Sequence, residues 1–293
     1  MNILIAIGGR KYSKPTLDLG MKVSNSFEAS TTIAYVGKKI SQFSEKDVSI
    51  VHQNLDERQL YRPGVRTLEW AYNFLKSKEY IQEEKVTTFN DHLLIDEEQS
   101  RMRVLLKGKH SNKINLILRT GEIIEQLRSE VQDNDHAITI IGGGNNKGMH
   151  HNLVQFIDSS VLVVKNYSVK KQYKILLPVN NSKGSNKAIE IAEQFAKANK
   201  LSVEIVTVLE NKSSDNRLKK ILERTEEKFS NAGIKNTATI LEGNVVKRIV
   251  ENAGDDSIIM LGVSPKNPIM KYFFGSKPIS IAAECNCPVL VAK

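Results

Sequence analysis

Apolar residues come in short uninterrupted runs that alternate with helical stretches, and this pattern occurs twice along the chain. When residues 2–37 are placed beneath residues 174–209 without a gap, the apolar positions of the two segments coincide, although few residues are identical. Each segment opens with a continuous apolar run, 3–7 or 175–179, which is typical of a strand buried on both faces of a parallel sheet. The chain is therefore predicted to contain an internal repeat.

The later parts of the two copies also correspond. In each copy a strand ends in a glycine turn, at Gly121 or Gly243, and is followed by a helix, a further strand and a closing strand at 161–164 or 289–292. Strands that alternate with helices form parallel sheets through right-handed crossovers. We therefore expect an α/β protein with two tandem Rossmann-like open parallel sheets of about five strands each and helices on both faces.

The polar and basic segment 166–172 separates the two copies, which predicts domains over residues 1–167 and 168–293. The first copy is longer, because it carries an inserted segment around residues 45–112. Within this insertion, residues 65–84 have apolar side chains at helical spacing and include the single tryptophan of the chain. We expect an added packing helix there, and a lid or a partner surface is the alternative.

The composition narrows the classes of partner. The 293 residues carry a net charge of +9, which favours anionic partners in general. Basic and acidic residues are interspersed, however, whereas nucleic-acid-binding chains more often contain uninterrupted basic blocks. We therefore expect a small anionic ligand rather than nucleic acid.

Two further features bear on location. No apolar run approaches the roughly 20 residues that span a bilayer, and the first residues lack the basic region of a signal peptide. The two cysteines, Cys285 and Cys287, cannot form a disulfide framework. We expect a cytoplasmic protein that does not bind membranes.

The segment 262–276 holds the most informative chemistry. Gly262 ends a predicted buried strand, and Gly275 and Ser276 precede a predicted helix, with two lysines between them. Ligands of open α/β sheets bind at the carboxyl ends of strands, and a helix N-terminus offers unpaired N–H groups to a phosphate. This arrangement predicts an anion site, and an ordinary strand–loop–helix connection with a capping serine is the alternative.

The same segment resembles the nucleotide loop of the universal stress protein family. That loop reads Gly-x2-Gly-x9-Gly-Ser/Thr and is followed by a helix and a Cys-Pro-Val-Leu-Val strand. Here Gly262, Gly275 and Ser276 have the matching spacing, and residues 287–291 reproduce the closing strand. Because both copies share the strand pattern, the chain resembles a tandem universal stress protein. The resemblance implies that Cys287 packs in the interior rather than taking part in redox chemistry, which is the alternative.

The resemblance implies an adenine-nucleotide site, for ATP or AMP, in the second domain. Pro265 replaces the second loop glycine and has no N–H to offer. Asn180 stands where the family has an aspartate that contacts the nucleoside, and Val208 stands where the backbone reads the adenine edge. Loss of the carboxylate weakens a metal-assisted role and leaves the involvement of Mg²⁺ open. The implied site consists of Asn180, Val208, Gly262, Pro265, Gly275 and Ser276.

The first copy departs further from this pattern. Gly8 stands at the position of Asn180, and no Gly-Ser pair follows the glycines at 142–144. We expect the first domain to be a degenerate copy without nucleotide. The neighbouring histidines, His150 and His151, point apart in any regular element, so we predict no metal site. No catalytic triad, Walker lysine loop or pair of catalytic carboxylates is recognisable.

Three functions follow from this reasoning. The first is a stress-response or regulatory protein that binds an adenine nucleotide without robust catalysis. The alternatives are a nucleotide-free interaction module with a decayed site and a slow ATP hydrolase. The resemblance also implies that the closing strands 161–164 and 289–292 pair with each other within the chain, because pairing covers two exposed sheet edges at once. It leaves a homodimer of the chain open.

Overall fold

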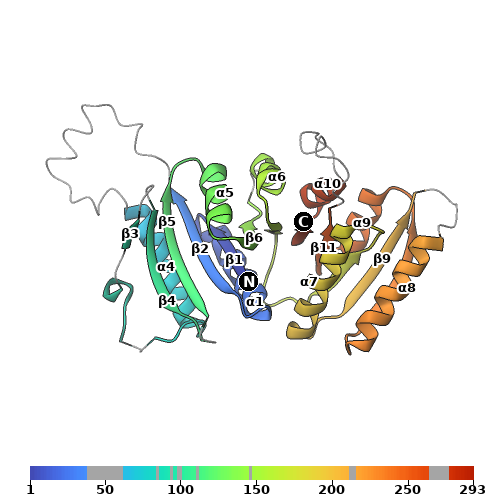
Figure 1. Ribbon diagram of the computed structural model, residues 1–293, viewed down its shortest axis with the longest axis horizontal. Helices are drawn as coiled ribbons and strands as arrows, with labels where there is room; N and C mark the ends of the chain where they lie inside the picture. Colours follow the sequence, from blue (N-terminus) through green and yellow to red (C-terminus); the bar gives the residue numbers. More distant parts are fainter. Residues whose placement is uncertain are drawn as a thin grey trace.

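The computed structural model of the protein contains one continuous sheet of 12 strands with helices on both faces (Figure 1). It describes residues 1–37, 62–83, 86–92, 95–97, 101–109, 112–144, 147–210, 216–263 and 277–293. The strand order is β10-β9-β8-β11-β12-β7-β6-β1-β2-β5-β4-β3. The two halves of the chain therefore form the two halves of the sheet, and β12 and β7 meet in the middle.

Each half contains five parallel strands in the same relative order. The strands of the first half are β1 (Asn2–Ile7), β2 (Ser30–Gly37), β5 (Lys113–Thr120), β6 (His136–Gly142) and β7 (Ser160–Val164). Those of the second are β8 (Lys174–Pro178), β9 (Val203–Leu209), β10 (Asn236–Glu242), β11 (Ser257–Gly262) and β12 (Val289–Ala292). The first strand of each half, β1 or β8, lies at its centre, as the apolar runs predicted.

Helices cover both faces of the sheet, which confirms the predicted α/β class. One face carries α1 (Arg10–Ser26), α4 (Arg62–Ser77), α7 (Lys183–Asn199) and α8 (Asn216–Asn231). The other carries α5 (Ile123–Asp133), α6 (Lys147–Phe156), α9 (Val245–Ala253) and α10 (Lys277–Glu284). Each helix buries one apolar stripe against the sheet, so two separate cores lie above and below it.

The glycine turns of the two copies have the same structure. Gly121 and Gly243 both adopt a positive φ, of 148° and 118°, which favours glycine over residues with a side chain. Gly121 donates its N–H to the carbonyl of Gly37, and Gly243 donates its N–H to the carbonyl of Leu209, both at 2.9 Å. The segments 2–37 and 174–209 therefore end in equivalent hydrogen bonds, from Gly121 and from Gly243, and this equivalence supports the internal repeat.

The first half departs from the predicted count of about five strands because its insertion extends the sheet. The inserted strands are β3 (Ile95–Glu97) and β4 (Arg101–Lys107), and a short 3-10 helix, η1 (Phe89–Asp91), precedes them. β4 pairs antiparallel with the whole length of β5. Sequence reasoning missed these strands, which cover an edge of the parallel sheet that would otherwise expose unpaired backbone groups.

The predicted packing helix of the insertion is α4, which ends at Ser77 rather than extending to residue 84. Leu68, Tyr72 and Leu75 on its inner face are fully buried, and the Tyr72 hydroxyl donates to the carbonyl of Thr87 at 3.2 Å. α4 therefore adds to the core of the first half. Residues 45–61, the first part of the predicted insertion, lie outside the described residues.

A buried ion cluster fastens the insertion to the first half. Glu130 on α5 has no exposed side-chain surface, and it accepts hydrogen bonds from Arg101 on β4 and from Arg119 on β5, at 2.7 to 3.0 Å. Burial alone would raise the pKa of Glu130. The polar side chains of His136 and Arg101 beside it, together with the positive charges of Arg101 and Arg119, outweigh this and lower that pKa to about 2.

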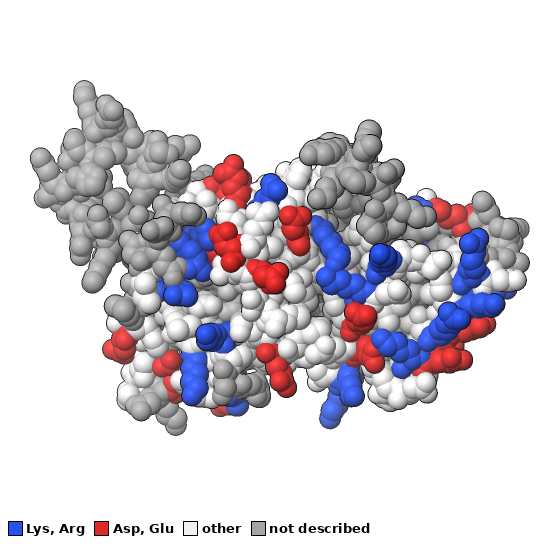
Figure 2. All heavy atoms as spheres, viewed as in Figure 1, with Lys and Arg blue, Asp and Glu red and all other residues white. Residues whose placement is uncertain are grey.

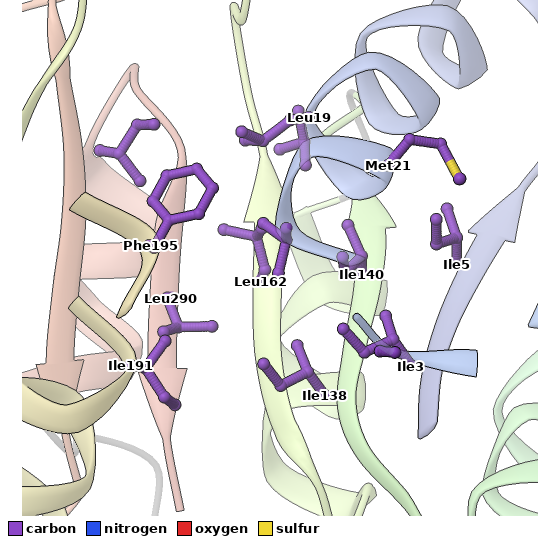
Figure 3. Packing of buried hydrophobic residues seen from close by; sticks show 14 of the residues in the cluster. Ile3, Ile5, Leu19, Met21, Ile138, Ile140, Leu162, Ile191, Phe195 and Leu290 are labelled. Atoms are coloured by element: carbon purple, nitrogen blue, oxygen red, sulfur yellow. The ribbon is translucent and has the colours of Figure 1, made fainter. Parts of the chain in front are cut away.

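The two halves are joined by antiparallel pairing of β7 with β12. Leu162 lies opposite Leu290, with Val161 opposite Val291 and Val163 opposite Val289. The register is symmetric about the leucine pair, which confirms the predicted pairing of the closing strands. In Figure 3 Leu162 and Leu290 lie side by side at this junction, between side chains of α1 and α7.

Two lysines cross the junction in a reciprocal way. Lys165 follows β7, and its ammonium group donates to the carbonyls of Ala282, Ala283 and Cys285 at the end of α10, at 2.6, 3.0 and 3.2 Å. Lys293 follows β12, and its ammonium group donates to the carbonyl of Ile157 at the end of α6. A cation stabilises the last carbonyls of a helix, so each half caps a helix of the other.

The ion cluster predicts a specific pH dependence. Folding depresses the pKa of Glu130 from its ordinary value of 4.5, so its contribution to stability is present above that value and is lost as the pH falls toward 2. We expect Glu130→Gln to lower the free energy of unfolding at pH 7 by about 3 kcal/mol or more, because the arginines lose their buried partner. Urea denaturation between pH 7 and pH 2 measures this.

The control is Glu125→Gln, which changes an exposed carboxylate on the same helix. The difference in stability between the wild type and Glu130→Gln should shrink as the pH falls, whereas Glu125→Gln should follow the wild type throughout. If the difference in unfolding free energy between the wild type and Glu130→Gln stays constant from pH 7 to pH 2, the depressed pKa of Glu130 is contradicted.

Candidate functional site

The candidate site lies where the strand order of the second half reverses. From the central strand β8 the chain moves outward through β9 and β10 in one direction, and β11 and β12 lie in the other. The crossover helices α7 and α10 leave on opposite faces at this point, between β8 and β11. Such a reversal opens a crevice at the carboxyl ends of the two strands, which is the usual ligand position in open α/β sheets.

Asn180 lies at the edge of this crevice, in the turn that connects β8 to α7. Its N–H donates to the hydroxyl of Ser185 at 3.0 Å, and its carbonyl accepts from the N–H of Ser182 at 2.9 Å. The Asn180 side chain is exposed. In the first half, the N–H of Gly8 donates to Ser13 at 2.9 Å in the same way. The turn is common to both copies, and the amide side chain is present only in the second.

Gly262 ends β11 in direct backbone contact with the first turn of α7. A methyl group at Gly262 would lie 1.9 Å from the carbonyl carbon of Gly184, and one at Gly184 would lie 2.0 Å from the carbonyl oxygen of Val263. Both positions therefore require glycine. The contact holds the N-terminus of α7 against the crevice, where the side chain of Ser182 caps it by accepting from the Ser185 N–H at 3.2 Å.

Val208 lies near the end of β9, one strand away from Asn180 on the same edge. It is half-buried and packs against the core beneath α9 and α10. Neighbouring bonds fix the ends of the two strands: the N–H of Val179 donates to the carbonyl of Val206 at 2.8 Å, and the Thr207 hydroxyl donates to the carbonyl of Val179 at 3.2 Å. The structure thus brings Asn180, Val208 and Gly262 together on three adjacent strands.

The other three residues of the predicted site, Pro265, Gly275 and Ser276, lie outside the described residues. Next to them, Lys277 at the start of α10 forms an ion pair with Glu210, just after β9, at 2.7 Å. Both side chains are about half exposed, so the pair is weak and free to rearrange. Sequence reasoning missed this pair and the role of Gly184. A glycine in the first turn of a predicted helix was the available signal for the latter.

The corresponding position of the first half has an equivalent backbone bond, since the Val263 N–H donates to the carbonyl of Ala292 at 2.9 Å in the second half, but it lacks the side chain of Asn180. Gly8 and Gly9 face open space after β1. After β6, the N–H of Gly143 donates to the carbonyl of Val164 at 2.7 Å, and a methyl group at Gly143 would lie 2.2 Å from the side chain of Lys165. The chain leaving β6 therefore packs on the junction with the second half. The expectation that this half binds no nucleotide stays a prediction.

The remaining candidate chemistry is structural. Both cysteines are buried beneath α10, and the hydrogen bond with Cys285, together with burial, raises the pKa of Cys287. Cys287 therefore stays a neutral thiol and packs as an apolar side chain, as expected. Among the described residues, no group of His, Cys, Asp and Glu side chains could hold a metal ion. The side chains of His150 and His151 lie outside what the structure describes.

Comparison with known proteins agrees with this geometry. The model of the universal stress protein family matches residues 173–293. Residues 173–293 are therefore similar to a universal stress protein domain, although the match covers less than half of the chain. A solved universal stress protein from Archaeoglobus fulgidus is similar over all of this chain and 96% of its own, with a TM-score of 0.63 and 14% sequence identity. The whole chain therefore has the fold of a universal stress protein that also spans both halves.

Two further solved structures are similar. A protein from Pseudomonas aeruginosa UCBPP-PA14, described as a universal stress protein, matches all of this chain and 92% of its own, with a TM-score of 0.57 and 14% identity. A universal stress protein solved in complex with cAMP matches 42% of this chain and 98% of its own, with a TM-score of 0.36 and 21% identity. Among curated proteins, none matches this chain.

Positively and negatively charged side chains are mixed on the surface of the protein. Figure 2 shows lysine and arginine side chains next to aspartate and glutamate side chains over much of the drawn face, as the interspersed sequence predicted. Within the described part of the chain, no helix has the length and apolar character needed to cross a membrane.

The contact between Gly262 and Gly184 predicts a strong effect of a single methyl group. We expect Gly262→Ala to lower the free energy of unfolding by about 1–3 kcal/mol, because the added atom overlaps the backbone of α7. Gly9→Ala is the matched control, since Gly9 has an ordinary φ of −60° and open space around it. It should change stability by less than about 0.5 kcal/mol. Equal urea midpoints for the two variants would contradict the close contact.

Proposed function

We propose that the second half binds an adenine nucleotide, ATP or AMP, in the crevice at the carboxyl ends of β8, β9 and β11. The protein then acts in a stress response or in regulation, as a binding protein without robust catalysis. The observation that carries the proposal is the placement of Asn180, Val208 and Gly262 on three adjacent strands at the point where the strand order reverses. The family match over residues 173–293 supports it.

The roles follow from the chemistry of each position. The exposed Asn180 amide can donate to one ribose hydroxyl and accept from another. The backbone at Val208 lies one strand away, where it can pair with the polar edge of adenine. The phosphates lie toward Gly262, and the family resemblance implies that Gly275 and Ser276, which directly precede α10 in the sequence, contact them through N–H groups.

The described residues around the crevice favour nucleotide binding over ATP hydrolysis. The position that the family resemblance assigns to an aspartate is occupied by Asn180, an amide that cannot accept a proton as a general base. Glu210, the carboxylate that borders the crevice, pairs with Lys277. A nucleotide phosphate that enters near α10 would compete with Glu210 for this lysine. The involvement of Mg²⁺ stays open in this proposal.

Isothermal titration of the full chain with ATP and with AMP tests the proposal. We expect saturable binding at one site, which Asn180→Ala weakens about three- to tenfold, because a single hydrogen bond contributes roughly 0.5–1.5 kcal/mol. The matched control is Asn181→Ala, the neighbouring exposed asparagine. Gly275→Val should weaken binding at least tenfold, about 1.4 kcal/mol, and Gly148→Val in the first half should not.

The absence of ATP and AMP binding at about 1 mM would favour the interaction module instead. Equal affinities for Asn180→Ala and Asn181→Ala would remove Asn180 from the site. Phosphate release from bound ATP, measured in the same samples, separates a slow hydrolase from a binding protein. We expect no release above that of the Gly275→Val variant.

A further inference from the structure

A second hollow lies at the opposite edge of the second half, where its strands begin. It is a cleft of about 710 Å³, large enough for a small organic molecule. Tyr173, Ser202 and Lys235, which directly precede β8, β9 and β10, line it together with the end of α7 and the segment that links the two halves. The cleft is thus separate from the crevice at Asn180 and Gly262.

The apolar surface of the cleft comes from the partly buried residues Tyr173, Leu201 and Ala232. Behind them lie Leu19 of α1 in the first half and Phe195 of α7 and Ile258 of β11 in the second, and these three side chains are buried. Leu19 and Phe195 belong to the same core on one face of the sheet, so this core spans the junction (Figure 3). Tyr167 and Tyr173 stack at one side, with ring centroids 5.0 Å apart.

The rim of the cleft is strongly positive. Five lysines line it, from α1, the linking segment, α7, its C-cap and the turn before β10: Lys22, Lys171, Lys197, Lys200 and Lys235. None of the described residues that line the cleft is an aspartate or a glutamate. Lys171 pairs with Asp255 at 2.5 Å, and the structure gives the other four no carboxylate partner within the part of the chain that it describes.

Helix ends do not offset this charge. α7 and α8 both end at the cleft, and each C-terminus carries about half a negative elementary charge, about one charge together. The four lysines without a carboxylate partner carry about four times as much positive charge as these two helix ends carry negative charge. Like charges that face one hollow repel each other, and an anion in the hollow would relieve this repulsion.

The C-cap of α7 fixes the place of one lysine at the rim. Lys200 adopts a left-handed conformation there, with φ 54° and ψ 41°, while its N–H donates to the carbonyl of Ala196. Four other non-glycine residues of the described chain also have a positive φ, so the conformation positions Lys200 and is not by itself a sign of function.

We propose that this cleft binds a small organic polyanion, a molecule that has at least two phosphate or carboxylate groups and an apolar part. The acidic groups pair with the lysines of the rim, and the apolar part lies against Tyr173, Leu201 and Ala232. Because the ligand touches α1 as well as α7, its binding connects the two halves. This site is additional to the proposed nucleotide site.

Titration calorimetry at low ionic strength tests the proposal, with tripolyphosphate and citrate as separate probes. We expect the full chain to bind one equivalent of at least one probe, and the probe that binds identifies the acidic group. Lys200→Gln/Lys235→Gln should weaken binding at least tenfold, about 1.4 kcal/mol. Glutamine is uncharged, one atom shorter than lysine and still polar, so the loss of charge is the main change.

The matched control is Lys107→Gln/Lys220→Gln, which removes the same charge from two exposed lysines that do not line the cleft. It should stay within about twofold of the wild type, because distant surface charges are screened. Thermal melts of both variants check that they fold. Failure of both probes to bind at about 1 mM, or equal weakening by the two double variants, would overturn the proposal.

A further variant separates the two sites. Gly275→Val, at the position proposed for the phosphates of ATP, should leave tripolyphosphate binding unchanged while it weakens ATP binding. If Gly275→Val weakens tripolyphosphate binding as much as the cleft variant does, the probe occupies the crevice and the inference fails. If ATP binding is absent but tripolyphosphate binds and depends on Lys200 and Lys235, the cleft stands and the nucleotide proposal falls.

Discussion

The antiparallel pairing of β7 with β12 is the constraint on which the rest of the structure depends. Each half alone would end in a parallel strand with a free edge of unpaired N–H and C=O groups, and pairing the two edges removes both. The register is symmetric about Leu162 and Leu290, so the two sheets become one and the apolar core beneath α1 and α7 becomes continuous. Lys165 and Lys293 strengthen the same junction by capping helices across it.

This junction also sets where ligands can bind. The crevice of the second half depends on the order of strands within that half, so a single domain is enough to build it. The lysine-rich cleft, by contrast, needs Leu19 and Lys22 of the first half beside the end of α7, and it exists only because the halves are held together. A chain with two copies can therefore have one candidate site within a single copy, the crevice, and a second one at the junction of the copies, the lysine-rich cleft.

The two copies share their scaffold and differ in their chemistry. Gly8 and Asn180 sit in turns with the same hydrogen bond to a serine five residues later, so both turns are fixed by the backbone and the helix start. Only Asn180 adds a side chain that can contact a ligand. Loss of that side chain from the first copy leaves the fold unchanged, because the stabilising contact is made by the backbone N–H.

Local patterns predicted much of the fold. Continuous apolar runs identified β1 and β8 as central strands, and the closing strands identified the junction. The strands β3 and β4 were missed because the alternating arginines of Arg101–Lys107 become meaningful only when Glu130 on α5 lies beneath them. Such ion pairs join residues far apart in sequence, and no short-range pattern reports them.

The candidate site shows the same limit. Spacing and resemblance pointed to Asn180, Val208 and Gly262, and these residues lie at the carboxyl ends of three adjacent strands. Their role in binding a ligand stays a prediction. The contact between Gly262 and Gly184 was missed because it joins two backbones from different elements. The lysines of the cleft come from separate segments of the chain, so their convergence is visible only in three dimensions.

Hydrogen exchange of the backbone amides of β7 and β12 in the full chain tests the central claim most directly. If the pairing of these strands joins the halves into one cooperative unit, their amides should open with a free energy within about 1 kcal/mol of that of the central strands β1 and β8. Amides of β7 and β12 that exchange far faster than those of β1 and β8 would show that the halves open independently, and would contradict the account.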